Sequence, residues 1–186
     1  FLKNIVGLWI VQECRRFWEG KGTVYDYAAL TRMAEEAKPF AALIDPDDDR
    51  FLKPGEMPEK IAAFCRETKQ AVPSQPGEFV RCALESLALK YRSALEQLER
   101  VLESRIDKLH IVGGGCQNEL LCQFTANAIG RLAIAGPVEA TALGNCLIQA
   151  KALGHVKDFA HLRRIVRKSV SLKEYAPQQA KLWREQ

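Results

Sequence analysis

The strongest chemical signal in the sequence is a run of three glycines, Gly113, Gly114 and Gly115, in the segment LHIVGGGCQNELLCQF. Apolar residues before the run predict a strand, and periodic apolar residues after it predict a helix from about Asn118 to Ile129. Glycines at such a turn let the backbone approach a ligand, and the start of a helix offers unpaired N–H groups to an anion. The spacing matches neither GxGxxG nor GxxxxGKS/T. Nucleotide or phosphate binding and a tight packing turn therefore both remain open.

A second segment, AGPVEATALGNCLIQAKALG, predicts a helix with an unusually small surface. Pro137 sets the backbone dihedral of a helix start, and Ala140, Ala142 and Gly144 leave room for another backbone to approach. Taken alone, this helix is a packing element and not a site.

These segments must be positioned by a mainly helical chain. Apolar periodicity and breaking residues predict helices at 4–18, 25–37, 59–68, 77–103, 118–129 and 138–153, and strands at 109–112 and 131–135. The segment between the second and third helices is rich in turn residues, with a short strand expected at 41–44. Strand, turn and helix follow one another twice, which is the pattern of a parallel α/β sheet. The last 30 residues predict one or two covering helices and a polar tail.

Composition limits the class of protein. The 186 residues suffice for one domain, and 47% hydrophobic with 27% charged residues is typical of a globular chain. No apolar run approaches the roughly 18 to 20 residues of a membrane span, so we expect a soluble protein without a membrane partner. The net charge is +4, and its main basic cluster, at 163–168, has helical spacing. We interpret that cluster as a solvated helix face and expect no nucleic-acid partner.

The six cysteines show neither CxxC spacing nor a histidine at zinc-ligand distance, so we expect a reducing, cytoplasmic environment. Cys65 and Cys82 flank a proline-rich loop, and antiparallel packing of their helices could bring them within bonding distance. A bridge and two buried thiols both remain open. The acidic run 45–49 lacks calcium-loop spacing, and a turn explains it, so we predict no metal site in the chain.

Several segments together resemble the C-terminal region of the FGGY carbohydrate kinase family, in order and through almost the whole chain. They are NIVGLWIVQECRR, LIDPDDDRF, GEFVRCALESLALKYR, VGGG with QN, and AGPVEATALGN. The resemblance implies a ribonuclease H-like fold of the actin and hexokinase ATPase type, of which residues 1–186 would form the helix-rich C-terminal lobe without its first strands. NIVGLW together with DPDDDRF points within the family to kinases that phosphorylate L-rhamnulose at O1.

The resemblance also implies ATP and Mg²⁺ as cofactors and assigns residues to the nucleotide. Gly114 in the run 113–115 would lie against it, and Asn118 would face the adenine. Asn4 and Gln12 match family positions at the nucleotide; at helical spacing they differ by about 80° and could border one site. A helix cap remains the alternative for Asn4, and an interior hydrogen bond is the alternative for Gln12.

The family's catalytic aspartate lies in an HDTA-type segment that this chain lacks, so we predict no catalytic residue here. The chain begins at Phe1 and not at Met, and we expect it to be part of a longer kinase whose N-terminal sugar-binding domain is absent. Alone it should be inactive, and its uncovered sheet edge, near residues 1–9, should favour self-association. Another sugar kinase of the family, a non-catalytic nucleotide-binding module and a structural fragment are the alternatives.

Overall fold

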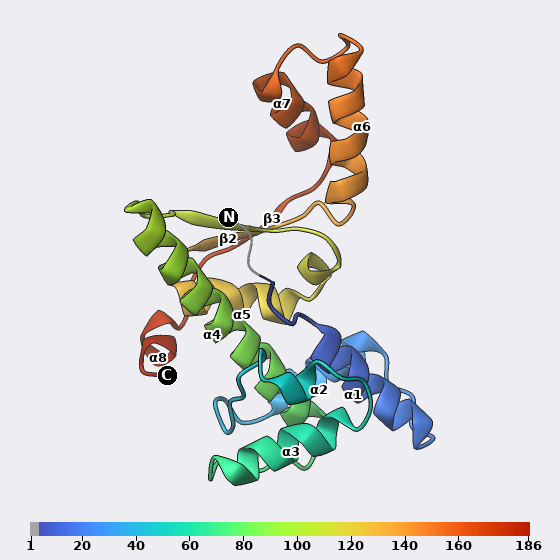
Figure 1. Ribbon diagram of the computed structural model, residues 1–186, viewed down its shortest axis with the longest axis vertical. Helices are drawn as coiled ribbons and strands as arrows, with labels where there is room; N and C mark the ends of the chain where they lie inside the picture. The colour runs from blue at the N-terminus through green and yellow to red at the C-terminus, as the bar shows by residue number, and fades with distance from the viewer. Residues whose placement is uncertain (1–3) are drawn as a thin grey trace.

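The computed structural model describes residues 4–186 and shows a helix-rich α/β protein with one small sheet (Figure 1). Its elements, in chain order, are α1 (Trp9–Gly20), α2 (Tyr27–Glu36), η1 (Asp49–Phe51), α3 (Met57–Glu67), α4 (Pro76–Leu102), β1 (Lys108–Ile111), η2 (Gly114–Gln117), α5 (Glu119–Ile129), β2 (Leu132–Ala135), α6 (Ala140–Ala152), α7 (Phe159–Ser169), β3 (Lys173–Tyr175) and α8 (Ala180–Arg184). Helices α1 to α3 lie at one end, the α6–α7 pair stands apart at the other, and the sheet lies between them.

Helix α4 connects the two ends of the molecule. Its 27 residues span about 40 Å, and α1, α2 and α5 all pack against it. The first half, 79–88, is buried on every side, whereas the second half is only partly covered. Burial of this apolar stripe is the main stabilising contribution to the helix, because propensity alone leaves most helices marginal.

Helix α2 approaches α4 so closely that their backbones are in contact. Gly77, in the first turn of α4, lies against Met33, and a Cβ atom at this glycine would overlap the Met33 carbonyl. Arg81 adds a polar tie, since its Nη1 donates to the carbonyl oxygens of Ala34 and Glu35 at 2.9 and 3.1 Å. Its Nε donates to the buried Glu85 carboxylate at 2.7 Å.

The irregular segment between α2 and α3 is attached to the helices by side chains. Ser86 of α4 accepts the N–H of Ile44 at 2.9 Å, and Gln70 accepts the N–H of Leu43 at 2.7 Å. The strand predicted at 41–44 is therefore wrong. These side-chain acceptors take the place of a neighbouring strand.

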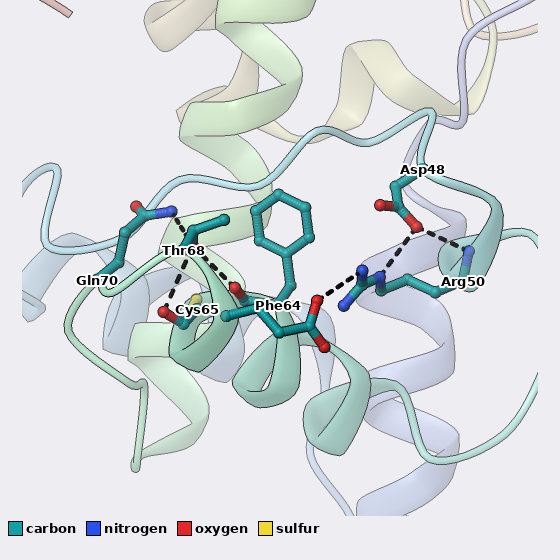
Figure 2. Close-up of polar contacts among 7 residues, drawn as sticks. Asp48, Arg50, Phe64, Cys65, Thr68 and Gln70 are labelled. Carbon is teal, nitrogen blue, oxygen red and sulfur yellow. Dashed lines mark hydrogen bonds and ion pairs between the residues drawn. The ribbon is translucent and has the colours of Figure 1, made fainter.

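A second set of side chains joins η1 to α3 (Figure 2). The Arg50 guanidinium lies between the carboxylates of Asp48 and Glu67, at 2.9 Å from each, and 5.1 Å from the centre of the Phe64 ring. Asp48 also accepts the backbone N–H of Arg50 and so caps η1. The acidic run forms the turn that the sequence predicted, and the structure adds the ion pairs of its carboxylates.

The sheet has the order β1-β2-β3. Strands β1 and β2 are parallel, with His110 opposite Ile134, and β3 is antiparallel to β2, with Tyr175 opposite Ala133. The parallel pair and the helix after each strand confirm the predicted α/β pattern. Strand β3 was missed, because its three residues carry no alternating pattern and only pairing to β2 makes them a strand.

Two further expectations are corrected. Asn4 does not cap α1, because the helix begins at Trp9 after Leu8. The preceding segment contacts the acidic loop, where the Val6 N–H donates to Asp47 Oδ1 at 3.4 Å. The polar tail is also wrong at Trp183, which is 1% exposed. Its ring packs on Phe40 and Phe124, so α8 closes the core beside α4 and α5. Phe1 and Leu2 lie outside the described residues.

Cys65 and Cys82 are buried free thiols that contact each other. The hydrogen bond between the two thiols lowers the pKa of Cys65. The same bond, together with burial, raises the pKa of Cys82. Of the two alternatives that the sequence left open, the structure shows two buried thiols and no bridge. None of the helices within residues 4–186 is long and apolar enough to cross a bilayer.

An ion pair fixes the sheet to the end of α4. Glu99 receives two hydrogen bonds from Arg131, which precedes β2, and Nη1 of Arg131 also donates to the carbonyl of Ile106, which precedes β1, at 2.6 Å. The hydrogen bonds from Arg131, and then that from the Ile106 N–H, lower the pKa of Glu99. The starts of both parallel strands are thus attached to one helix.

Glu99→Gln should lower the free energy of unfolding at neutral pH. This loss should become smaller as the pH falls. A lowered folded-state pKa means that the carboxylate stabilises the fold above its unfolded-state pKa of about 4.3, and this contribution disappears as the pH falls through the lowered value. Urea midpoints of wild type and variant, measured from pH 7 to about pH 3.5, should therefore converge. Glu96→Gln, on the same helix with a 3.9 Å contact to Arg92, is the control and should show little difference at any pH. A wild-type advantage that stays constant down to the lowest pH would contradict this assignment.

Gly77→Ala should destabilise the fold by about 1–3 kcal/mol, because the added methyl group overlaps the Met33 backbone, which is unable to rotate away. The matched control is Gly144→Ala in α6, where a Cβ meets nothing within 4 Å. That change should be neutral or stabilise by up to about 1 kcal/mol, as alanine favours helix. Chemical denaturation of the two variants measures the difference in their stability. Equal midpoints would contradict the prediction and show that α2 moves at little cost to accommodate the methyl group.

Candidate nucleotide site

A cleft of about 830 Å³ lies between the glycine run and helices α1 and α2. We call it the glycine cleft. One wall is formed by η2 and the start of α5, and the other by the first turn of α1 and one face of α2. Its lining residues are Leu8, Trp9, Gln12, Tyr27, Ala28, Thr31, Arg32, Glu35, Gly114, Gly115, Gln117, Asn118 and Glu119.

The turn from β1 into η2 requires glycine at its first position only. Gly113 has φ +76° and ψ −165°, a conformation that residues with a side chain rarely adopt. Its N–H donates to the carbonyl of Pro137 at 3.1 Å, which connects the turn to the segment after β2. Gly113 does not line the cleft, so its role is to bend the chain.

The other two glycines have no such local explanation. Gly114 and Gly115 both line the cleft, neither has positive φ, and a Cβ at either position would meet nothing within 4 Å. Packing within the described residues therefore does not require glycine here. The open space beside these two backbone positions is the cleft itself.

Asn118 ends the glycine turn and begins α5. Its Oδ1 accepts the N–H of Leu121 at 2.8 Å, which satisfies one of the free donors of the first helical turn. The side chain is partly exposed and lines the cleft. The cap thus fixes the position of the asparagine in the wall.

The opposite wall is formed by partly exposed polar and aromatic side chains. Gln12 of α1 lines it, together with Tyr27, Thr31 and Arg32, which lie on one face of α2. The charged lining residues are Arg32, Glu35 and Glu119. Lys173 of β3 pairs with Glu119 at 2.7 Å, and this hydrogen bond raises the pKa of the lysine.

Four of the six residues assigned to the nucleotide from the sequence thus line one cleft: Gln12, Gly114, Gly115 and Asn118. Asn4 does not line it, because the segment before Leu8 is not helical, and the helical spacing between Asn4 and Gln12 does not apply. Sequence reasoning missed the α2 wall. Only the repeat of polar residues at 27, 31 and 35 on one helix face could have indicated it.

Within residues 4–186 no three histidine, cysteine, aspartate or glutamate side chains gather in a way that could hold a metal ion.

Curated relatives match the chain along nearly its full length. Rhamnulokinase from Bacteroides thetaiotaomicron is 47% identical over 182 residues, which are 98% of this chain and 37% of that protein. Rhamnulokinase from Bacillus subtilis is 40% identical over 177 residues, covering 95% of this chain and 36% of that protein. The chain therefore spans a little over a third of the length of these relatives.

Solved structures show the same fold at low identity. Xylulose kinase from Rhodospirillum rubrum aligns with a TM-score of 0.65 at 18% identity, over 95% of this chain and 35% of that one. Glycerol kinase from Plasmodium falciparum, solved with ADP, aligns with a TM-score of 0.61 at 14% identity, over 95% of this chain and 35% of that one. The helix-rich architecture with its small sheet is thus that of the C-terminal lobe of an actin and hexokinase-like fold.

The family model described as the C-terminal domain of the FGGY family of carbohydrate kinases matches residues 1–153, which include the glycine run and both walls of the cleft. The chain therefore belongs to the FGGY family of carbohydrate kinases and contains its C-terminal domain.

Proposed function

We propose that this chain is the nucleotide-binding domain of a longer kinase that transfers the γ-phosphoryl group of ATP to O1 of L-rhamnulose. The observation that carries the proposal is the pair Gly114 and Gly115, which face the glycine cleft without any need for glycine in packing or conformation. A ligand that lies directly against the backbone would explain why both positions are glycine. Two relatives at 40% and 47% identity are named rhamnulokinase, which supports L-rhamnulose as the proposed sugar substrate.

The cleft fits a nucleotide in size and in lining. Its volume of about 830 Å³ lies within the usual range of about 300–1,000 Å³ for small-molecule sites. The walls offer amide side chains of Gln12 and Asn118, the hydroxyl group of Thr31 and aromatic surface, all suited to a base and a ribose. Among the described residues, Arg32 is the one cation in the lining, so they contribute little positive charge toward three phosphates.

Phosphate charge would therefore be neutralised mainly by Mg²⁺ and by groups outside the cleft. Bound Mg²⁺ supplies electrostatic stabilisation of the charge that develops during phosphoryl transfer. No described residues form a cluster that would bind the ion by themselves, so the ion would be held chiefly by the nucleotide and by the rest of the kinase.

The proposed reaction divides between two domains. O1 of the sugar attacks the γ-phosphorus, the bond to the bridging oxygen of ADP breaks, and the hydroxyl proton passes to a carboxylate that we place outside residues 1–186. The chain would hold ATP at an interdomain cleft, and closure against the sugar-binding domain would exclude water. Residues 1–186 would thus bind and orient one substrate without carrying the base.

Activity should follow this division. The full-length protein, assayed with Mg-ATP and a panel of ketoses and polyols, should show its highest kcat/KM with L-rhamnulose, at a kcat in the usual kinase range of about 1–100 s⁻¹. The isolated chain should give no turnover with any sugar. Preference for another sugar would overturn the substrate assignment and leave the domain assignment intact, whereas turnover by the isolated chain would refute the division of labour.

Gly114→Val in the full-length protein should raise the KM for ATP about tenfold or more and change the sugar KM little, because the side chain would occupy the space beside the backbone that the nucleotide needs. Since Gly114 has no positive φ and the space around it is open, the variant should fold normally. Gly20→Val, in equally open space at the end of α1 and outside the cleft, is the matched control. Equal changes in both KM values would contradict a nucleotide at the glycine run.

A further inference from the structure

Tyr27 is the aromatic side chain most open to the glycine cleft. It is the first residue of α2, lines the cleft, and remains 46% exposed. Large aromatic side chains normally bury most of their surface, so an exposed ring in the wall of a concave site offers a contact surface to a ligand.

Arg15 holds this ring from outside the cleft. Its guanidinium carbon lies 4.8 Å from the centre of the Tyr27 ring, and Arg15 is not among the lining residues. The buried Nε of Arg15 has no hydrogen-bond partner among the described residues. The guanidinium therefore contacts the Tyr27 ring, and its Nε is not tied to an acceptor within the described residues. One side of the ring is therefore occupied by Arg15, while the tyrosine remains exposed to the cleft.

The other aromatic ring in the cleft is already used by the protein. Nε1 of Trp9 donates to the carbonyl of Phe51 at 3.2 Å, and the Arg16 guanidinium carbon lies 5.7 Å from the centre of the Trp9 ring. Trp9 is partly buried against the main core. It is therefore a fixed part of the wall, and Tyr27 is the ring available to a ligand.

The chemistry of the remaining lining identifies which part of a nucleotide lies here. Among the described residues, Arg32 is the only cation in the lining; it is accompanied by Glu35 and by Glu119, which pairs with Lys173, and the other polar side chains are neutral. Three phosphates would not be attracted to such a wall. A heteroaromatic base, which has an apolar face and polar edges, fits it.

We propose that Tyr27 is the stacking surface for the purine base of the bound nucleotide, with Arg15 as the positioning residue that holds its ring. This inference rests on the proposed function and adds to it the residue that contacts the base. Stacking depends on the π-face that every base presents, so Tyr27 should contribute affinity without selecting adenine over guanine.

The test measures binding of Mg-ADP and Mg-GDP to the full-length protein by titration calorimetry, together with the KM for the sugar. Base–aromatic stacking contributes about 1–3 kcal/mol per base, so Tyr27→Leu should weaken both nucleotides by about 5- to 150-fold, by similar factors. Tyr27→Phe keeps the ring and should bind within about twofold of wild type. Arg15→Gln should give a smaller loss, which disappears when it is combined with Tyr27→Leu.

The matched control is Phe159→Leu, which removes an aromatic ring of similar exposure, 58%, from α7 outside the cleft. It should leave nucleotide binding unchanged, and none of the variants should alter the sugar KM. Unchanged ADP affinity in Tyr27→Leu, or an equal loss in Tyr27→Phe, would overturn the stacking assignment. Failure of the wild-type protein to bind either nucleotide would instead refute the proposed function itself, so the two failures are distinguishable.

Discussion

The contact between α2 and α4 at Gly77 is the constraint on which the rest of the structure depends. Because a glycine there lets the two backbones touch, α2 packs closely against α4, and Arg81 fixes the end of α2 through two carbonyl oxygens. Helix α5 packs on the same α4 farther along. The glycine cleft lies between α2 and η2, and η2 leads directly into α5. Its width is therefore set by the separation of α2 and α5, which both pack on α4.

The second anchor works at the opposite end of α4. Glu99 holds Arg131 and, through it, the backbone before β1, so both parallel strands start from a fixed position. Four residues of β1 then carry the chain to the glycine turn. A displacement at this ion pair would therefore move Gly114 relative to Gln12. The site depends on contacts made well away from it, as expected when a ligand is bound between rigid elements and not by a loop.

The α6–α7 pair contributes to neither anchor. It stands apart from the helices that form the cleft (Figure 1), and its apolar side chains Ile148, Leu153 and Phe159 are substantially exposed. Base binding, as proposed, needs only α1, α2 and the glycine turn. The proposed phosphate and sugar contacts would involve groups other than the described residues that line the cleft.

The long helices, the parallel strand pair and the position of the glycine turn were predictable from the sequence, because periodicity, breaking residues and glycine backbone freedom are local properties. Family resemblance also assigned Gln12 and Asn118 to one site, and both line the glycine cleft. Three features follow from long-range packing alone: residues 41–44 hydrogen-bond to side chains, β3 joins the sheet, and Asn4 lies outside the cleft. The tertiary structure alone brought Tyr27 opposite Gly114, because that pairing depends on how two helices pack against a third, and no local pattern encodes such a distance.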